Sequence, residues 1–301
     1  MRATRRALVV AALIASALAC GRDAPPVPVG RAVRDDLGRT VVVPVTVTRV
    51  LSLAPSNTEL MFALGAGQRL VGRTDADDFP PEAAAVPSVG SLFPPDDERI
   101  VATRPDLVLM IDGNADLRQR LAERGLPVVV FQPRTLDGIL DTARRLGSLL
   151  GREAAAEALV ARLEAQRRAV LTRLPADRPR VFYEVWSSPL TAAGPATFVG
   201  DLVRTAGGRN ALGADLGDWP RLDVETLLAA DPDVLLLSRP GARAEVVAGQ
   251  RPGYSVLRAV SAGRVIEVVD PDLLERAGPR AFEGLAWLAA ALHPQAFGRA
   301  P

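Results

Sequence analysis

The chain has 301 residues, and its 48% hydrophobic content is enough for one large core or two smaller ones, which excludes a fully disordered protein. Thirty-six basic residues stand against thirty-five acidic ones, so the net charge of +1 gives no electrostatic argument for nucleic acid or an anionic membrane as partner. All of the basic residues are arginine, which we attribute to genomic base composition rather than to selection for guanidinium chemistry.

The N-terminal segment, residues 1–19, has the pattern of a secretory signal peptide. Three arginines precede an apolar run over residues 7–19 that is too short for a spanning helix. Cys20 follows directly and is the expected lipidation site, although the Ala-Leu-Ala before it also suits ordinary cleavage. Residues 20–37 are rich in Pro and Gly and are expected to form a flexible tether. We therefore expect a periplasmic or cell-surface protein, exported across the cytoplasmic membrane and anchored by lipid.

Residues 38–134 alternate short apolar runs with helical patterns, which is typical of a parallel α/β layer. Ser56 and Glu59 have the spacing of a capping box, which predicts a helix that begins at Asn57 and ends near Gly65. This stretch is expected to form the N-terminal lobe.

Two aromatic residues of the same block, Phe79 and Phe93, stand in otherwise polar loops. Both are candidates for a ligand cleft, and packing beneath the neighbouring prolines is the alternative for each of them.

Residues 135–175 predict a helical linker. Its second part has no internal Gly or Pro, and its apolar residues recur at helical spacing. A helix of about twenty-two residues would be about 33 Å long, roughly the width of a lobe. One stiff helix of this kind would limit hinge closure, so we expect a largely preformed cleft between two lobes.

Residues 176–296 repeat the α/β pattern, and a short internal duplication links the two blocks. ERIVATRPDLVLM (98–110) aligns without a gap with ETLLAADPDVLLL (225–237). Each copy predicts a short helix, a Pro-Asp turn and a buried strand. The sequence therefore predicts two similar α/β lobes with central parallel sheets, joined by one long helix.

The duplication places Glu98 and Glu225 at the same point of each lobe. A glutamate near a helix N-terminus is stabilising without any partner. Alternatively, two equivalent carboxylates could each meet an arginine cluster on one subunit of a two-fold partner.

The residue types needed for several common chemistries are absent. With one His and one Cys, the chain has no thiol/imidazole pair, Ser-His-Asp triad or nitrogen/sulfur metal site. We therefore expect a protein that is not an enzyme, with no catalytic residue, cofactor or bound metal. Asp77 with Asp78, and Asp270 with Asp272, remain possible acid/base pairs, so a secreted carboxylate-dependent hydrolase stays open as an alternative.

Two tryptophans and one charged loop are further candidates. Trp186 and Trp219 are expected at loop mouths, where ligands of open α/β sheets bind, although each could simply cover its own lobe. The loop DPDLLERAGPR, residues 270–280, is a solvated turn, an acid/base site or a clamp that orients a ligand. Within it we expect Glu275 to face solvent and Arg280 to lie in the first turn of the last helix.

Five segments carry a family resemblance. SLAPSNTELMFALG, VGRTDADDFPPEA, ERIVATRPDLVL, AGGRN and DLLERAGPR, in this order, resemble the cobalamin-binding members of the class III substrate-binding proteins of ABC importers. The resemblance covers about residues 38–292. It implies two α/β lobes joined by a long backbone helix, with the ligand between them, and a monomer that delivers its ligand to a two-fold permease.

By position, the resemblance also implies roles for individual residues. Asp272 and Arg276 match the charged pair that contacts the corrinoid, Trp219 matches a tryptophan that packs against it, and Trp186 lies where the family places an aromatic residue. Glu98 and Glu225 match the permease-docking positions of the family.

The N-terminal lobe departs from the family pattern. Ala76 stands where the family has Tyr, Leu92 where it has Trp, and Met110 or Ile111 where it has a further Trp. We therefore expect cobalamin or a related corrinoid, with a ferric siderophore or haem as the alternative. A basic cluster facing the cleft would favour a siderophore, and a Tyr or His there would favour haem; the two tyrosines are Tyr183 and Tyr254.

Overall fold

The computed structural model describes residues 30–91 and 93–298. The predicted signal peptide, Cys20 and Leu92 lie outside these residues. Within the described part, no helix has the length and apolar character that crossing a membrane requires.

The N-terminal lobe contains a four-stranded parallel sheet in the order β4-β3-β5-β6. Every residue of β3, β5 and β6 is buried, as expected for parallel strands covered on both faces. The elements of this lobe are β3 (Val50–Ser52), α2 (Pro55–Ala63), β4 (Leu70–Gly72), α3 (Asp97–Ala102), β5 (Leu107–Met110), α4 (Ala115–Glu123) and β6 (Val128–Val130).

The C-terminal lobe is built on the strand order β11-β10-β7-β8, and β9 pairs in parallel with the amino end of β7. Its elements are β7 (Arg180–Ser187), β8 (Leu190–Ala192), α7 (Phe198–Thr205), β9 (Arg209–Asn210), α8 (Val224–Ala230), β10 (Val234–Leu237), α9 (Ala242–Val247), α10 (Arg258–Ser261), β11 (Val265–Glu267), α11 (Asp272–Glu275), α12 (Ala281–Leu292) and α13 (Pro294–Phe297). The parallel order β9-β7-β10-β11 repeats β4-β3-β5-β6, and β8 is an antiparallel addition.

Backbone details confirm that the duplication is structural. Among the described residues, Arg104 and Asp231 are the two non-glycine residues with positive φ, and they occupy the same aligned position, directly before proline. The aspartate after each proline then accepts a hydrogen bond from the backbone at the start of the lobe's first strand. Asp106 accepts from the backbone N–H of Arg49 at 3.0 Å, and Asp233 from that of Arg180 at 2.8 Å. The same contact between an aspartate side chain and the backbone therefore holds the beginning of β3 in one sheet and of β7 in the other.

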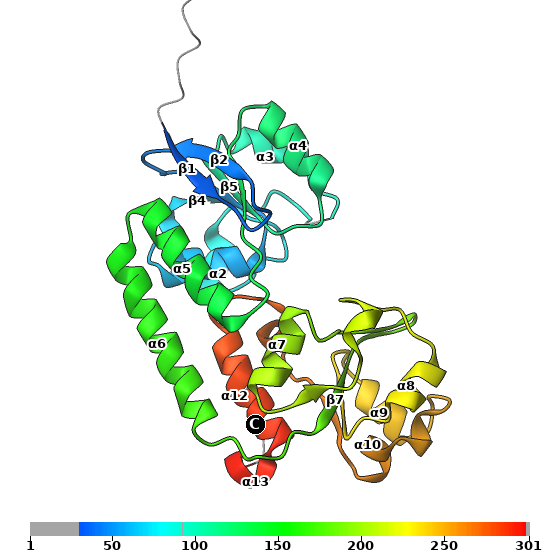
Figure 1. The fold of residues 1–301 in the computed structure, drawn as a ribbon. Coiled ribbons are helices and arrows are strands. Elements are labelled where there is room, and N and C mark those ends of the chain that lie inside the picture. The colour runs from blue at the N-terminus through cyan, green and yellow to red at the C-terminus, as the bar shows by residue number, and fades with distance from the viewer. Residues whose placement is uncertain (1–29, 92, 299–301) are drawn as a thin grey trace, which may run out of the picture.

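Two helices connect the lobes: α5 (Leu136–Leu150) and α6 (Glu153–Leu171). In Figure 1 the N-terminal lobe lies above the C-terminal lobe, and α6 runs along one side of both. With 19 residues, α6 is about 28 Å long, slightly shorter than predicted. It packs against α5 and α12, and one hydrophobic core contains strand residues of both sheets. The predicted fold class, two α/β lobes joined by a long helix, is confirmed.

Two local expectations differ from the structure. Helix α2 begins at Pro55, and because its N-cap is Ala54, no side chain caps it; Glu59 is turned toward an arginine of the other lobe. Residues 30–37, expected in the tether, begin with β1 (Gly30–Arg34), which pairs with β2 (Thr40–Pro44). The predicted end of α2 is right, since Gly65 adopts φ +66° just after it.

Candidate ligand cleft between the lobes

A cleft of about 280 Å³ lies between the two lobes. Its walls come from loops that follow the parallel strands and from the start of α2, where open α/β sheets bind ligands. The N-terminal side is lined by Pro55, Ser56, Ile111, Gln132, Pro133 and Arg134. The C-terminal side is lined by Thr197, Phe198, Trp219, Glu275, Arg276 and Ala277.

Two larger hollows lie elsewhere on the C-terminal lobe. One, of about 610 Å³, is at the amino ends of its strands and includes His293, and the other, of about 500 Å³, runs along the edge strand β11. Neither receives residues from both lobes. A third hollow, of about 380 Å³, does, but it lies against α6 and takes much of its lining from α2, α6 and α12. We therefore assign the interlobe cleft, which is lined by loops beyond the strands, as the candidate site.

Both arginines that line the cleft form ion pairs between the lobes. The guanidinium of Arg276 lies 2.6 Å from a carboxylate oxygen of Asp78 in the N-terminal lobe and 2.8 Å from one of Asp272. On the other side of the cleft, Arg134 lies 2.6 Å from Asp218 and also donates to the carbonyl of Ala196 at 2.7 Å. The positive charge of the cleft is therefore compensated.

The environment shifts the pKa of the carboxyls around Arg276 in opposite directions. The hydrogen bond from Arg276 lowers the pKa of Asp78. Burial raises the pKa of Asp272, which the neighbouring Arg276 opposes only in part.

Arg280 bridges the lobes more deeply. It donates from Nε and Nη2 to one oxygen of Glu59, at 3.2 and 2.9 Å, and Glu59 is only 3% exposed. Burial raises the pKa of Glu59 even beside this arginine. The guanidinium also lies 4.0 Å from the centre of the Phe79 ring. Arg280 is therefore the N-cap of α12 rather than a residue of its first turn, as was predicted. It also forms a contact between the lobes.

Glu275 is exposed, as predicted, but its carboxylate also has partners within the protein. Its carboxylate accepts hydrogen bonds from the hydroxyls of Tyr183, at 2.8 Å, and Ser238, at 2.6 Å, and it reaches the cleft wall. The phenol of Tyr183 is 1% exposed, and burial raises its pKa. Tyr254 is likewise buried and donates to Glu184 at 2.9 Å.

Asp77, considered as half of an acid/base pair with Asp78, is buried. Its carboxylate accepts hydrogen bonds from the hydroxyls of Thr58 and Thr74, both at 2.8 Å. Burial raises its pKa to about 6. It anchors the loop that carries Asp78 and Phe79 and has no access to a substrate.

Of the predicted ligand residues, Trp219 and Arg276 line the cleft and Asp272 pairs with Arg276 beside it. Trp186 lies at the carboxyl end of β7, is 61% exposed and does not line the cleft. Phe93 does not line the cleft and lies in a small neighbouring hollow beside Met110 and Ile111.

Glu98 and Glu225 are both exposed second residues of short helices, α3 and α8, and neither has an ion pair within residues 30–91 and 93–298. Because an aspartate already caps each helix, neither glutamate is needed to satisfy the first N–H groups.

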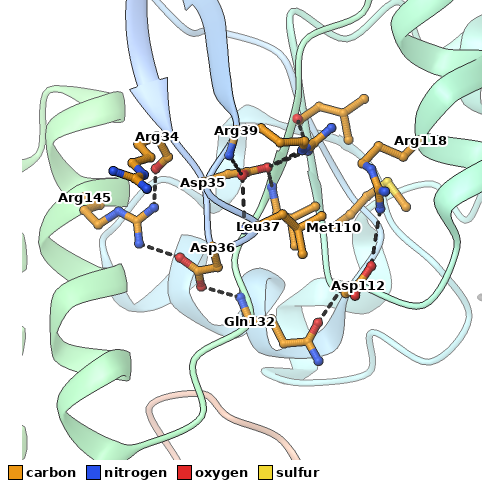
Figure 2. Close-up of polar contacts among 12 residues, drawn as sticks. Arg34, Asp35, Asp36, Leu37, Arg39, Met110, Asp112, Arg118, Gln132 and Arg145 are labelled. Carbon is orange, nitrogen blue, oxygen red and sulfur yellow. Dashed lines mark hydrogen bonds and ion pairs between the residues drawn. The ribbon is translucent and has the colours of Figure 1, made fainter.

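The sequence did not point to Gln132 or Arg134. Figure 2 shows how Gln132 is held: its Oε1 accepts from the Asp112 N–H at 2.6 Å, and its backbone N–H donates to Asp36 at 2.6 Å. Asp36 also pairs with Arg145 of α5 at 2.6 Å. The turn between β1 and β2 thus supports the cleft wall through contacts that no local sequence pattern reveals.

Residues 50–271 match the model of the periplasmic binding protein family. An ABC transporter substrate-binding lipoprotein of Bacillus subtilis, YvrC, is 30% identical over 83% of this chain and 81% of its own. A cobalamin-binding protein of Halobacterium salinarum is 31% identical over 81% and 69%. The structure of a periplasmic heme-binding protein from Pseudomonas aeruginosa has a TM-score of 0.74 at 28% identity, over 83% of this chain and 94% of that one. The chain therefore belongs to the periplasmic binding protein family, and its fold is that of the class III members.

Proposed function

We propose that this protein is the extracytoplasmic substrate-binding protein of an ABC importer and that it binds cobalamin or a related corrinoid between its lobes. The relatives named for cobalamin and for ABC transport support the general role. Because a haem binder is about as similar in structure, the ligand has to be argued from the cleft itself.

The observation that carries the ligand assignment is the charge state of the cleft. Arg134 and Arg276 each face a carboxylate within 2.6 Å, so neither is an uncompensated cation for an anionic ferric siderophore. A corrinoid instead presents apolar ring faces rimmed by amides. It suits aromatic walls, such as Phe198 and Trp219, beside a few fixed polar groups.

The positions of the tyrosines and the histidine argue against haem. Tyr183 and Tyr254 are buried, and the hydroxyl of each donates a hydrogen bond to a glutamate. His293 is 5% exposed and belongs to the far end of the C-terminal lobe. Within the described residues, none of the three is placed to bind the iron of a haem in the cleft.

The size of the cleft sets how a corrinoid would lie. At about 280 Å³, it is slightly below the usual range of ligand pockets, about 300 to 1,000 Å³. One face of the ring would enter the cleft beside Trp219, and the rest would extend over the exposed rim toward Trp186.

Delivery to the permease would use the equivalent glutamates. Glu98 and Glu225 project from matching helices of the two lobes and are free of intramolecular ion pairs in the described part of the chain. Two such carboxylates suit the arginine clusters of a two-fold membrane partner. Export, attachment through Cys20 and a monomeric state, with lobes at 38–134 and 176–296 around the linker 135–175, belong to the same proposal.

Calorimetry of the purified protein with cyanocobalamin, cobinamide, haem and ferric siderophores tests the ligand. We expect the corrinoids to bind and the iron ligands not to bind. Binding of an iron ligand alone would overturn the assignment, and turnover of an ester or glycoside panel would instead support the hydrolase alternative. Palmitate labelling that persists in Cys20→Ser would contradict the anchor.

A further inference from the structure

A three-stranded patch lies at the carboxyl end of β7. Trp186 of β7 pairs with Thr191 of β8, and Thr191 in turn pairs antiparallel with Arg221. The hydrogen bonds Ala192 N–H to Pro220 carbonyl, 3.2 Å, and Leu222 N–H to Leu190 carbonyl, 2.8 Å, flank the second pair. Thr191 and Arg221 are thus a non-hydrogen-bonded pair, in which side chains are closest, about 4.5 Å between Cα atoms. Because directly opposed residues share a face, Trp186, Thr191 and Arg221 form one row.

This row lies on the cleft side of the sheet. Phe182, Leu190 and Ala192 point into a separate core on the opposite face, so Thr191 faces the other way. The register shift between Glu184 and Trp186 is a bulge that turns Trp186 to the face of Thr191. Tyr183, which reaches Glu275 at the cleft wall, belongs to the core on this face.

Arg221 differs from the two arginines that line the cleft. It is exposed and has no ion pair or side-chain hydrogen bond within residues 30–91 and 93–298, whereas Arg134 and Arg276 are both paired. It follows Trp219 by two residues and shares its row with Trp186. A free guanidinium beside exposed aromatic residues is suited to a phosphate oxygen, because its planar fork can donate two hydrogen bonds.

We infer that Arg221 binds the phosphodiester of the nucleotide loop and so distinguishes complete corrinoids from those that lack this loop. This inference rests on the proposed function. Arg134 and Arg276 would bind the amide-rimmed ring. Arg221, at the rim, would bind the phosphodiester, which cobalamin has and cobinamide lacks.

The test measures the Kd of cyanocobalamin and of dicyanocobinamide, which has no phosphate, at low ionic strength. In Arg221→Gln we expect cyanocobalamin to bind about three- to tenfold more weakly and dicyanocobinamide to bind unchanged. Arg221→Lys, which keeps the charge, should recover part of the loss. Arg209→Gln is the matched control, because Arg209 is also exposed and unpaired among the described residues but lies at the amino end of β7.

The outcomes separate the two proposals. If the wild-type protein binds neither corrinoid, the proposed function fails and this inference fails with it. If it binds cyanocobalamin but Arg221→Gln leaves the ratio of the two Kd values unchanged, the corrinoid assignment stands and only the role of Arg221 is overturned. A change in Arg209→Gln as large as that in Arg221→Gln would also overturn it, because the effect would then be general electrostatics.

Discussion

Replacing Arg280 by Met should destabilise the protein more than any other single change at the interlobe surface. The carboxylate of Glu59 is 3% exposed, and its Oε1 receives both hydrogen bonds from Arg280, while Arg276 stands farther off at 4.0 Å. Within the described residues, Oε2 has no hydrogen-bond partner. Breaking a buried pair from one side typically costs 3–5 kcal/mol. We expect about 3 kcal/mol at pH 7.5, the lower end, because Glu59 already has a raised pKa and can take up a proton.

Urea unfolding followed by circular dichroism measures this loss as a lower midpoint at an unchanged slope. Glu59→Gln in the Arg280→Met background should recover about 1–2 kcal/mol, because the uncompensated buried charge is then gone. The deficit of Arg280→Met should also shrink as the pH falls, because the raised pKa of Glu59 lets its carboxylate take up a proton. A loss below about 1 kcal/mol, or strictly additive single changes, would refute the idea that the buried pair fixes the lobes.

Three further predictions follow from the site. In the folded protein the pKa of Asp77 is raised from 3.8 to about 6, so protonated Asp77 stabilises the fold. This stabilisation is fully present below pH 3.8 and is lost as the pH rises through about 6. The stability of the wild type relative to Asp77→Asn should therefore rise by about 2.4 kcal/mol from pH 7 to pH 4, and unfolding differences that do not depend on pH would contradict it. Trp219→Ala should weaken corrinoid binding by about 2 kcal/mol with stability nearly unchanged, since the ring is 51% exposed, and calorimetry that shows equal affinity would exclude its role. Charge reversal at Glu98 and Glu225 together should abolish transport but leave ligand affinity intact, and an unchanged transport rate would exclude docking there.

Some features were readable from local sequence because a local physical rule produces them. The continuous apolar runs at 107–110 and 234–237 are buried parallel strands, and the Pro-Asp turns before them recur with the same strained backbone at Arg104 and Asp231. The gapless repeat therefore predicted the similar lobes correctly. By contrast, the capping-box spacing of Ser56 and Glu59 was misleading, since the pattern describes a helix in isolation.

The long-range polar contacts required the tertiary structure. Glu59 lies 221 residues from Arg280, and Asp78 lies 198 residues from Arg276. No residue spacing encodes such pairs, because they depend on how the loop before α12 lies against α2 and against the loop that carries Asp78.

By itself, the sequence determined the two α/β lobes, the helix between them and the family, since periodicity, turn residues and the repeat act over short stretches of chain. Through the family resemblance it also singled out Trp219, Asp272 and Arg276 as ligand candidates, and the structure brings Trp219 and Arg276 to the cleft wall. Only the tertiary structure decided which charges are compensated. It paired Arg134 with Asp218 and Arg276 with Asp78, buried both tyrosines behind glutamates and left Arg221 unpaired among the described residues, because charge compensation is a property of distances between side chains.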